Sequence, residues 1–122
     1  MGKIVLTVDD SRTMRDMLKL ALTEAGLEVL QAEDGVHGVE VLDQAGAVDV
    51  IITDINMPRM DGYGFIDHVR NNPRTRATPI LVLTTESEPA KKQRARDAGA
   101  TGWIVKPFDP EKLIAAVRKV SP

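Results

Sequence analysis

Five side chains that can take part in chemistry stand at the ends of apolar runs in the sequence. They are Asp9 and Asp10 after IVLTV, Asp54 after IIT, Thr84 at the end of ILVLT, and Lys106 after WIV. An aspartate after a single strand is usually a turn or helix-cap residue, and that explanation would suffice for each one alone. Three carboxylates, a hydroxyl and an ammonium group in equivalent positions indicate a shared site instead.

Carboxylates held close together repel one another and require a cation. Oxygen ligands without histidine or cysteine suit a hard ion, and Mg²⁺ typically takes one or two carboxylates, several waters and a phosphate oxygen. A carboxylate can also act as the nucleophile toward phosphorus and form an acyl phosphate. Lys106 would then offset charge on the transferred group, and the Thr84 hydroxyl would donate to a phosphate oxygen. These residue types indicate phosphoryl transfer to Asp54 beside Mg²⁺.

The elements that must position these side chains alternate along the chain. Short runs rich in β-branched residues predict strands, and apolar residues at helical spacing predict helices between them. The predicted strands span residues 4–8, 28–32, 48–53, 80–84 and 103–105. The predicted helices run from the N-cap Ser11 to Gly26, around residues 36–42, between Gly62 and Pro73, over 88–98, and from Pro110 to Val120.

Five strand-then-helix units with short connections predict one fold class. It is α/β, a doubly wound five-stranded parallel sheet with five helices on its two faces, flavodoxin-like and a single domain. In such sheets the functional crevice lies at the carboxyl ends of the strands, where the winding direction reverses. We therefore expect the five side chains to meet at that edge.

Composition excludes several other classes of protein. The 16 lysines and arginines against 18 aspartates and glutamates leave a net charge of −2, so we expect no binding to nucleic acid or to membrane. The absence of cysteine excludes a disulfide framework and a thiolate metal site. No apolar stretch approaches membrane-spanning length, and the first residues do not form a signal peptide. We expect a cytoplasmic protein.

Three stretches of the sequence carry a family resemblance. The opening VDDSRTMR (residues 8–15), the central DINMPRMDG (54–62) and the later GATGWIVKPF (99–108) resemble the receiver domain of two-component response regulators. The similarity covers nearly the whole chain and is greatest to the single-domain chemotaxis members. The central stretch is the most specific of the three. The resemblance implies a receiver domain over residues 1–122 that accepts a phosphoryl group from a histidine kinase.

The resemblance also implies a role for each residue of the site. By position, Asp54 is the phosphoacceptor, and Asp9 and Asp10 are the acidic pair that binds Mg²⁺. Asn56 stands where the family offers a backbone carbonyl to the metal, beside Asp54 itself. Lys106 matches the lysine that contacts the phosphoryl group. Since all these positions are filled, the resemblance implies a receiver that can be phosphorylated.

Other positions match residues that control switching in the family. Thr84 matches the switch hydroxyl, and Trp103 stands where the chemotaxis members have tyrosine. We expect Trp103 to move on activation but, because indole is bulkier than phenol, to occupy its inward position less than tyrosine would. Asn56 and Glu86 match positions that tune dephosphorylation. Lys106 and Pro107 stand where the family has a cis peptide.

The expected output is a contact with another protein, since the 122 residues leave no room for an output domain. The resemblance implies a contact face made of the helix over 88–98, the last strand and the last helix. The helix over 88–98 carries almost no apolar residue larger than alanine, so we expect it to be loosely packed and free to shift. The flagellar motor switch is the first expected target of this monomer, and a phosphatase is a further expected partner. The alternative is a free-standing receiver that passes phosphate along a relay or regulates another kinase.

Two unrelated classes fit less well. A haloacid-dehalogenase-type phosphatase also forms an aspartyl phosphate, but it needs a second aspartate two positions after the nucleophile, where this chain has Asn56. A flavodoxin-like electron carrier needs a phosphate-binding loop after its first strand, and VDDSRT would repel a phosphate. We therefore expect no enzymatic activity beyond the protein's own phosphorylation and dephosphorylation at Asp54.

Overall fold

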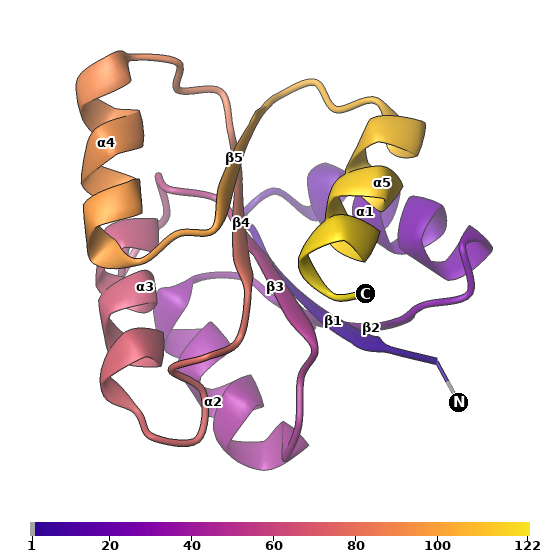
Figure 1. Cartoon of the computed structure of the whole chain (residues 1–122), viewed down its shortest axis with the longest axis horizontal. Helices are drawn as coiled ribbons and strands as arrows, with labels where there is room; N and C mark the ends of the chain where they lie inside the picture. Colours follow the sequence, from indigo (N-terminus) through magenta and orange to yellow (C-terminus); the bar gives the residue numbers. More distant parts are fainter. Residues whose placement is uncertain (1) are drawn as a thin grey trace.

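Five strands alternate with five helices in the computed structural model, which describes residues 2–122 (Figure 1). The strands are β1 (Ile4–Val8), β2 (Glu28–Ala32), β3 (Val50–Thr53), β4 (Ile80–Thr84) and β5 (Gly102–Val105). The helices are α1 (Arg12–Glu24), α2 (Gly35–Ala45), α3 (Gly62–Asn71), α4 (Pro89–Ala98) and α5 (Pro110–Val120). Within residues 2–122, no helix has the length and hydropathy needed to cross a bilayer.

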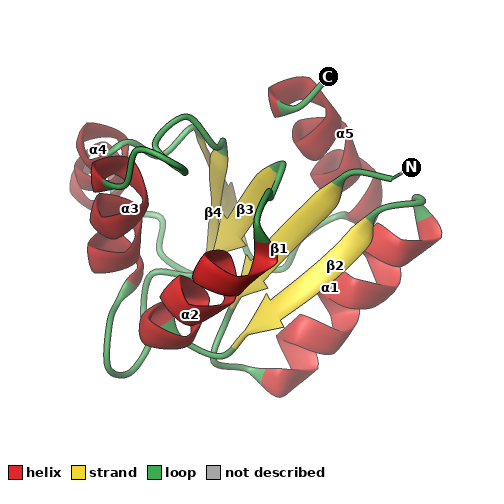
Figure 2. Cartoon of the chain, turned by 90° about the horizontal axis from the view of Figure 1, so that it is seen from below, coloured by secondary structure: helices red, strands yellow, loops and turns green. Residues whose placement is uncertain are grey.

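All strands pair in parallel in one sheet of order β2-β1-β3-β4-β5 (Figure 2). The predicted fold class is therefore confirmed. The winding direction reverses between β1 and β3, and the register there pairs Val8 with Thr53. Because each is the last residue of its strand, Asp9 and Asp54 leave the sheet side by side.

Helices cover both faces of the sheet, which explains why the inner strands β1, β3 and β4 are almost entirely apolar. Figures 1 and 2 show α2, α3 and α4 on one side and α1 and α5 on the other. Alternate strand residues enter two separate cores, so that Leu6 and Val8 pack under the first set of helices and Val5 under the second. This double burial makes the strand ends firm supports for the side chains that follow them.

The predicted third strand starts two residues too early. Residues 48–53 were expected, but β3 begins at Val50. Asp49 is the reason, because its Oδ2 accepts from the N–H of Ile4 at 2.7 Å and its own N–H donates to the carbonyl of Ile4 at 2.8 Å. Asp49 is thus hydrogen-bonded to the first residue of β1, at the edge of the sheet opposite the one that carries Asp9 and Asp54. The predicted N-cap at Ser11 is confirmed, since its side chain accepts from the N–H of Met14.

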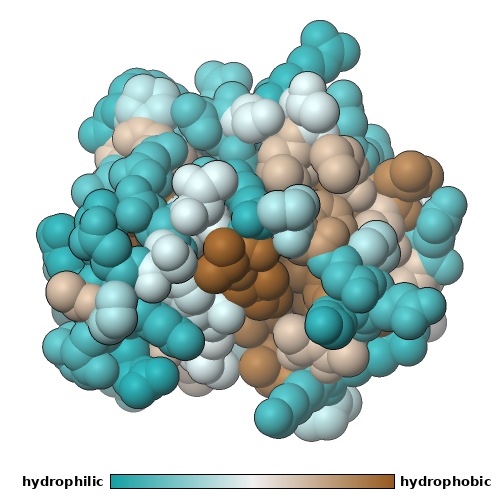
Figure 3. Space-filling view, turned by 90° about the horizontal axis from the view of Figure 1, so that it is seen from above, coloured by the Kyte–Doolittle hydropathy of each residue, from teal (hydrophilic) through white to brown (hydrophobic). Residues whose placement is uncertain are grey.

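The two sides of the molecule differ in surface character. Figure 3 shows hydrophobic side chains gathered toward α1 and α5 and hydrophilic ones over the α4 side. Met17 and Leu20 of α1 are among the exposed large hydrophobic residues, and they line a depression with Phe108 and Pro110. On α4 only Ala95 is buried. As expected, α4 has little apolar surface with which to pack.

Candidate metal centre

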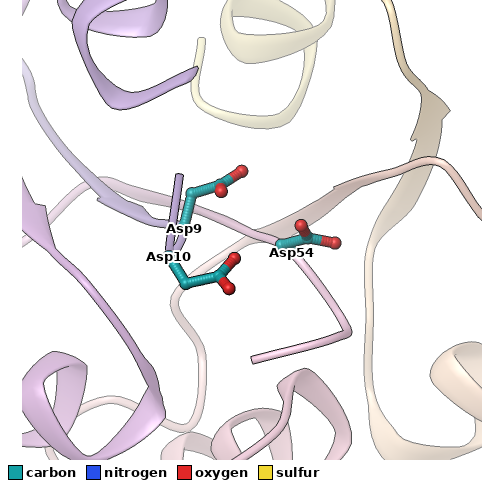
Figure 4. A group of neighbouring side chains, drawn as sticks. All are labelled: Asp9, Asp10 and Asp54. Atoms are coloured by element: carbon teal, nitrogen blue, oxygen red, sulfur yellow. The ribbon is translucent and has the colours of Figure 1, made fainter. Parts of the chain in front are cut away.

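Three carboxyl groups lie together at the ends of β1 and β3. One oxygen of each of Asp9, Asp10 and Asp54 lies within 4.8 Å of the other two. Figure 4 shows the three groups gathered beside one another. Asp9 and Asp54 are buried, with 1% and 8% of their surface exposed, whereas Asp10 is exposed. The site therefore combines two buried acids with one that faces solvent.

The ammonium group of Lys106 neutralises part of this charge. Its Nζ donates to Oδ2 of Asp9 and to Oδ2 of Asp54, at 2.8 Å in each case. Burial lowers the pKa of Lys106, but the hydrogen bonds to Asp54 and Asp9 outweigh it, and the pKa lies above its ordinary value. Burial also raises the pKa of Asp9, and the hydrogen bond from Lys106 offsets this rise only in part. Lys106 is thus a charged bridge between the two buried acids.

Backbone hydrogen bonds hold both buried acids in place. The N–H of Asp54 donates to the carbonyl of Val8 at 2.9 Å, which continues the pairing of the strands. Oδ1 of Asp54 accepts from the N–H of Ile55 at 2.6 Å, and Oδ1 of Asp9 accepts from the N–H of Ser11 at 2.9 Å. In each acid, one oxygen is held by the backbone and the other faces the lysine.

Thr84 and Trp103 are connected through the backbone of Glu86. Thr84 is fully buried at the end of β4, and its Oγ1 accepts from the N–H of Glu86 at 3.3 Å. The indole N–H of Trp103 donates to the carbonyl of Glu86 at 3.2 Å. Trp103 is half-buried and packs against the core beneath α2, α3 and α4. A displacement of the Glu86 backbone would therefore alter the hydrogen bonds of both Thr84 and Trp103.

The side chain of Glu86 joins the loop after β3 to the first turn of α4. Its Oε1 accepts from Nδ2 of Asn56 at 3.3 Å, and its Oε2 lies 3.0 Å from Nζ of Lys91. The hydrogen bond from Lys91, followed by that from Asn56, lowers the pKa of Glu86. The hydroxyl of Tyr63 donates to the carbonyl of Lys91 at 3.3 Å, which ties this turn to α3. Glu86 is the junction of the loops around the site.

The donor set fits a hard divalent cation such as Mg²⁺. The three clustered acids offer only oxygen ligands, which Mg²⁺ prefers. The charged bridge from Lys106 to Asp54 marks where this site already accommodates positive charge. Asp9, Asp10, Asp54 and the backbone carbonyl of Asn56 would hold the ion. A bound ion would offset the negative charge of a phosphoryl group placed beside Asp54.

Asp10→Ala is expected to weaken Mg²⁺ binding about tenfold or more, because it removes one oxygen ligand and one negative charge. Lys106 does not bridge to Asp10, so the loss leaves the hydrogen bonds of the metal-free site in place. Calorimetric titration with MgCl₂ measures the change. Asp16→Ala is the matched control, since Asp16 is an exposed aspartate of α1 whose ion pair with Arg12 is long, at 4.0 Å. Equal affinities for the two variants would exclude Asp10 from the site.

The predicted residues form two connected groups. Asp9, Asp10, Asp54 and Lys106 surround the candidate metal position, and Thr84, Asn56, Glu86 and Trp103 form the chain of contacts at its rim. The peptide bond between Lys106 and Pro107 is cis, as the resemblance implies.

Two participants were missed from the sequence. Arg15 donates through Nη1 to the carbonyl of Asp9 at 2.8 Å, and Lys91 pairs with Glu86. Neither residue was assigned a role from the sequence. Lys91 follows Glu86 by five positions across a helix start, which is not a spacing that sequence rules associate with an ion pair.

Comparisons with known proteins agree with this geometry. The family model described as "Response regulator receiver domain" matches residues 5–118. The chain is 44% identical over 110 residues to the chemotaxis protein CheY1 of Helicobacter pylori, covering 89% of each protein. A solved structure of the chemotaxis protein CheY4 of Vibrio cholerae is 46% identical and superposes with a TM-score of 0.93, over 98% of this chain and 99% of that one. The chain is also 34% identical to a part of the sensor histidine kinase CheAY of Helicobacter pylori, covering 95% of this chain and 15% of the kinase.

Proposed function

Because this chain belongs to the response regulator receiver domain family, we propose that it is a switch whose state is set by phosphorylation of Asp54. A histidine kinase donates the phosphoryl group, and the phosphorylated form binds a protein target. The observation that carries this proposal is the bridge from Lys106 to both Asp9 and Asp54, which gathers three strand ends around one nucleophile. The protein acts as a monomer in the cytoplasm and catalyses only its own phosphorylation and dephosphorylation.

The site residues have distinct tasks in the proposed transfer. A carboxylate oxygen of Asp54 forms a bond to phosphorus while the bond from phosphorus to the histidine nitrogen of the kinase breaks, and that nitrogen keeps the electron pair. Asp9, Asp10 and Asp54 would hold Mg²⁺, which would supply positive charge beside the transferred group. Lys106 exchanges its hydrogen bond with Asp54 for one with a phosphoryl oxygen, and the Thr84 hydroxyl donates to another. Asn56 supplies no carboxylate to activate water, so the acyl phosphate persists long enough to act as a signal.

We propose the flagellar motor switch as the target, because the similar proteins from Helicobacter pylori and Vibrio cholerae are named as chemotaxis proteins. The expected contact face comprises α4, β5 and α5. On it, α4 exposes Lys92, Arg94 and Arg96, and β5 exposes Val105. The second candidate function is a relay intermediate or a regulator of another kinase. The match to one part of a sensor histidine kinase favours that candidate, since it shows a similar domain within a kinase chain.

Phosphotransfer followed by a binding measurement tests this function. The purified protein is mixed with Mg²⁺ and each phosphorylated histidine kinase of the source organism, and its affinity for the purified motor switch protein is then measured. We expect label to appear on this protein and its affinity for the motor switch to rise about tenfold or more, which corresponds to about 1.4 kcal/mol. Transfer with no change in affinity would favour the relay function. Absence of transfer from every kinase and from acetyl phosphate would overturn the switch itself.

Exchanges at Asn56 and Glu86 are expected to change the lifetime of the acyl phosphate without preventing its formation. Nδ2 of Asn56, two residues after Asp54 in the chain, donates to Oε1 of Glu86 at 3.3 Å, and we propose that the pair restricts the approach of water to Asp54. Asn56→Asp introduces a carboxylate that can activate water and should shorten the lifetime about tenfold or more. Loss of label after removal of the phosphodonor measures the rate. Gln93→Asp, an exposed amide-to-acid exchange on α4, is the control. If variants at Asn56 and at Glu86 both have the same acyl phosphate lifetime as this control, neither residue tunes dephosphorylation.

Fluorescence of Trp103, the single tryptophan, is expected to change when Mg²⁺ and beryllofluoride are added together. Recruitment of the Thr84 hydroxyl to the phosphoryl mimic would release the N–H of Glu86, and the carbonyl of Glu86 is the acceptor of the indole N–H. Overpacking of the indole in its inward position is expected to cost about 1–3 kcal/mol relative to phenol. Trp103→Tyr should therefore raise the affinity of the unphosphorylated form for its target. An unchanged spectrum together with unchanged affinities would make Trp103 a packing residue only.

A further inference from the structure

The loop between β3 and α3, which carries Asn56, is attached at its tip, Arg59, to a neighbouring turn. Nε of Arg59 donates to Oδ2 of Asp34 at 2.8 Å, and Nη2 of Arg59 donates to Oδ1 of the same carboxylate at 3.0 Å. Asp34 lies in the turn between β2 and α2. Two parallel hydrogen bonds between a guanidinium and a carboxylate fix orientation as well as distance. The contact therefore holds two loops of the functional edge in one relative position.

Asp34 is a rigid partner for this contact. Only 3% of its surface is exposed, and its Oδ1 also accepts from the N–H of His37 as the N-cap of α2. The hydrogen bond from Arg59 lowers the pKa of Asp34, against the effect of burial, and the bond from His37 lowers it further. The carboxylate is thus charged at neutral pH and fixed to the start of a helix.

The backbone conformation at Arg59 is unusual, and the neighbouring turn packs closely against it. Arg59 has a φ of 65°, and it is the one non-glycine residue within 2–122 that adopts a positive φ. The N–H of Gly35 donates to the carbonyl of Met60 at 3.2 Å, and a Cβ at Gly35 would lie 2.6 Å from that oxygen. The two turns are therefore in direct backbone contact. An arginine in a conformation that side chains rarely adopt indicates that its contact with Asp34 maintains it.

The base of the same loop is closed as well. The N–H of Gly62 donates to the carbonyl of Ile55 at 2.8 Å, and a Cβ at Gly62 would collide with the carbonyl oxygen of Asp54. Residues 56–61 are thus held at two points, by the hydrogen bond between Gly62 and Ile55 at the base of the loop and by Arg59 at its tip. Asn56 lies between these two attachments, two residues after Asp54.

We propose that Arg59 is a positioning residue for the metal centre. Its ion pair with Asp34 holds the loop so that the backbone carbonyl of Asn56 is directed at the clustered carboxylates. This inference rests on the proposed function, since it concerns the Mg²⁺ that the function requires. Mg²⁺ demands nearly ideal octahedral geometry, so a small displacement of one ligand weakens binding. Arg59 acts through the loop and does not contact the ion.

Arg59→Asn separates positioning from electrostatics. Asparagine tolerates a positive φ better than most side chains, so the substitution removes the ion pair without adding backbone strain. Loss of a cation from the protein would by charge alone strengthen Mg²⁺ binding. Loss of positioning has the opposite sign. We expect the Kd for Mg²⁺, measured by calorimetric titration, to rise about tenfold or more, as for a lost outer-shell partner of a metal site.

Two further variants make the test specific to the pair. Asp34→Asn keeps a cap oxygen for His37 and should raise the Kd by a similar factor. The double variant Asp34→Asn/Arg59→Asn leaves no unpaired buried charge, and it should bind Mg²⁺ about as weakly as either single variant, because residues that act as a unit are not additive. Lys119→Asn removes an exposed cation of α5 and serves as the charge-matched control.

Phosphorylation supplies a second readout. With acetyl phosphate, the variants should be slow at low Mg²⁺ and recover the wild-type rate at saturating Mg²⁺, which a general structural defect would not produce. Thermal melting without Mg²⁺ identifies any variant that has not folded. If a single variant has not folded, the Mg²⁺ affinity of the double variant is the deciding measurement. If Arg59→Asn and the double variant bind Mg²⁺ as tightly as Lys119→Asn does, this inference is overturned and the proposed function is not. Failure of the wild-type protein to bind Mg²⁺ or to be phosphorylated would instead overturn the proposed function.

Discussion

Asp54→Asn is expected to abolish Mg²⁺-dependent labelling of the protein by acetyl phosphate or by a phosphorylated kinase. The amide that replaces the carboxylate is not a nucleophile toward phosphorus, and the site offers no substitute. Asp9 is bridged by Lys106 and held by the N–H of Ser11, and Asp10 is exposed; both acids follow β1, whereas Asp54 follows β3. We therefore expect a loss of labelling of at least about a hundredfold, as for removal of a catalytic nucleophile.

Intact-mass spectrometry after incubation with acetyl phosphate measures this loss directly. Asp61→Asn is the matched control, because Asp61 is an exposed aspartate seven positions later in the same loop. Asparagine at position 61 keeps an oxygen that can cap α3, as the aspartate does through the N–H of Gly64. Labelling of Asp54→Asn at the level of this control would overturn the assignment of the phosphoacceptor.

Lys106→Ala is expected to produce two effects of opposite sign. Without the ammonium group, the buried carboxylates of Asp9 and Asp54 face each other with no cation between them, so the metal-free protein is destabilised. Breaking a fully buried ion pair costs about 3–5 kcal/mol, and solvent access to this site reduces the expected loss to about 1–3 kcal/mol. For a domain of this size, that corresponds to a fall in Tm of about 4–10 °C. Mg²⁺ binding is retained or strengthened, because a competing cation has been removed.

Thermal melts with and without Mg²⁺ test this expectation, and the difference between Lys106→Ala and wild type should shrink when Mg²⁺ is added. Activation is tested separately, since a phosphoryl group without its lysine contact should no longer increase affinity for the target. Lys112→Ala, an exposed lysine of α5, is the control. A Lys106→Ala variant that melts like the control and still responds to phosphorylation would remove Lys106 from both roles.

The contribution of Lys106 to stability also has an expected pH dependence. Its pKa is raised above the ordinary value of 10.5 in the folded protein. A group of this kind stabilises the native state fully below its unfolded pKa and loses that contribution as the pH rises through the folded pKa. The difference in metal-free Tm between wild type and Lys106→Ala should therefore be constant across neutral pH and shrink only above about pH 10.

Much of the site followed from strand ends alone. In a parallel sheet every strand presents its carboxyl end to the same edge, so the positions of Asp9 and Asp54 could be predicted from sequence patterns. The start of β3 could not be predicted in this way. Asp49 belongs to an apolar stretch, but it is hydrogen-bonded to Ile4, a residue 45 positions away. Register at a strand start depends on such partners, and a local pattern does not contain them.

The contacts at the rim of the site were beyond sequence reasoning for a related reason. Arg59 follows a proline in a loop, where a charged residue is ordinarily taken as a solvated surface group. Its buried partner Asp34 resembles a simple helix cap. Only the crossing of two loops brings them together, 25 positions apart in the chain. The bond from the indole of Trp103 to the carbonyl of Glu86 depends in the same way on the arrangement of β5 beside β4.

The lysine bridge also sets a condition on when the protein can first become functional during its synthesis. The two hydrogen bonds of Lys106 span 97 and 52 positions of the chain, to an acid delivered by the ribosome near the beginning and to another near the middle. A nascent chain that ends before β5 can contain the proposed phosphoacceptor and metal ligands but not Lys106, the cation proposed to contact the phosphoryl group. Under the proposed function, competence to signal therefore arises only with the last strand, so an incompletely translated chain that captured a phosphoryl group would not transmit it.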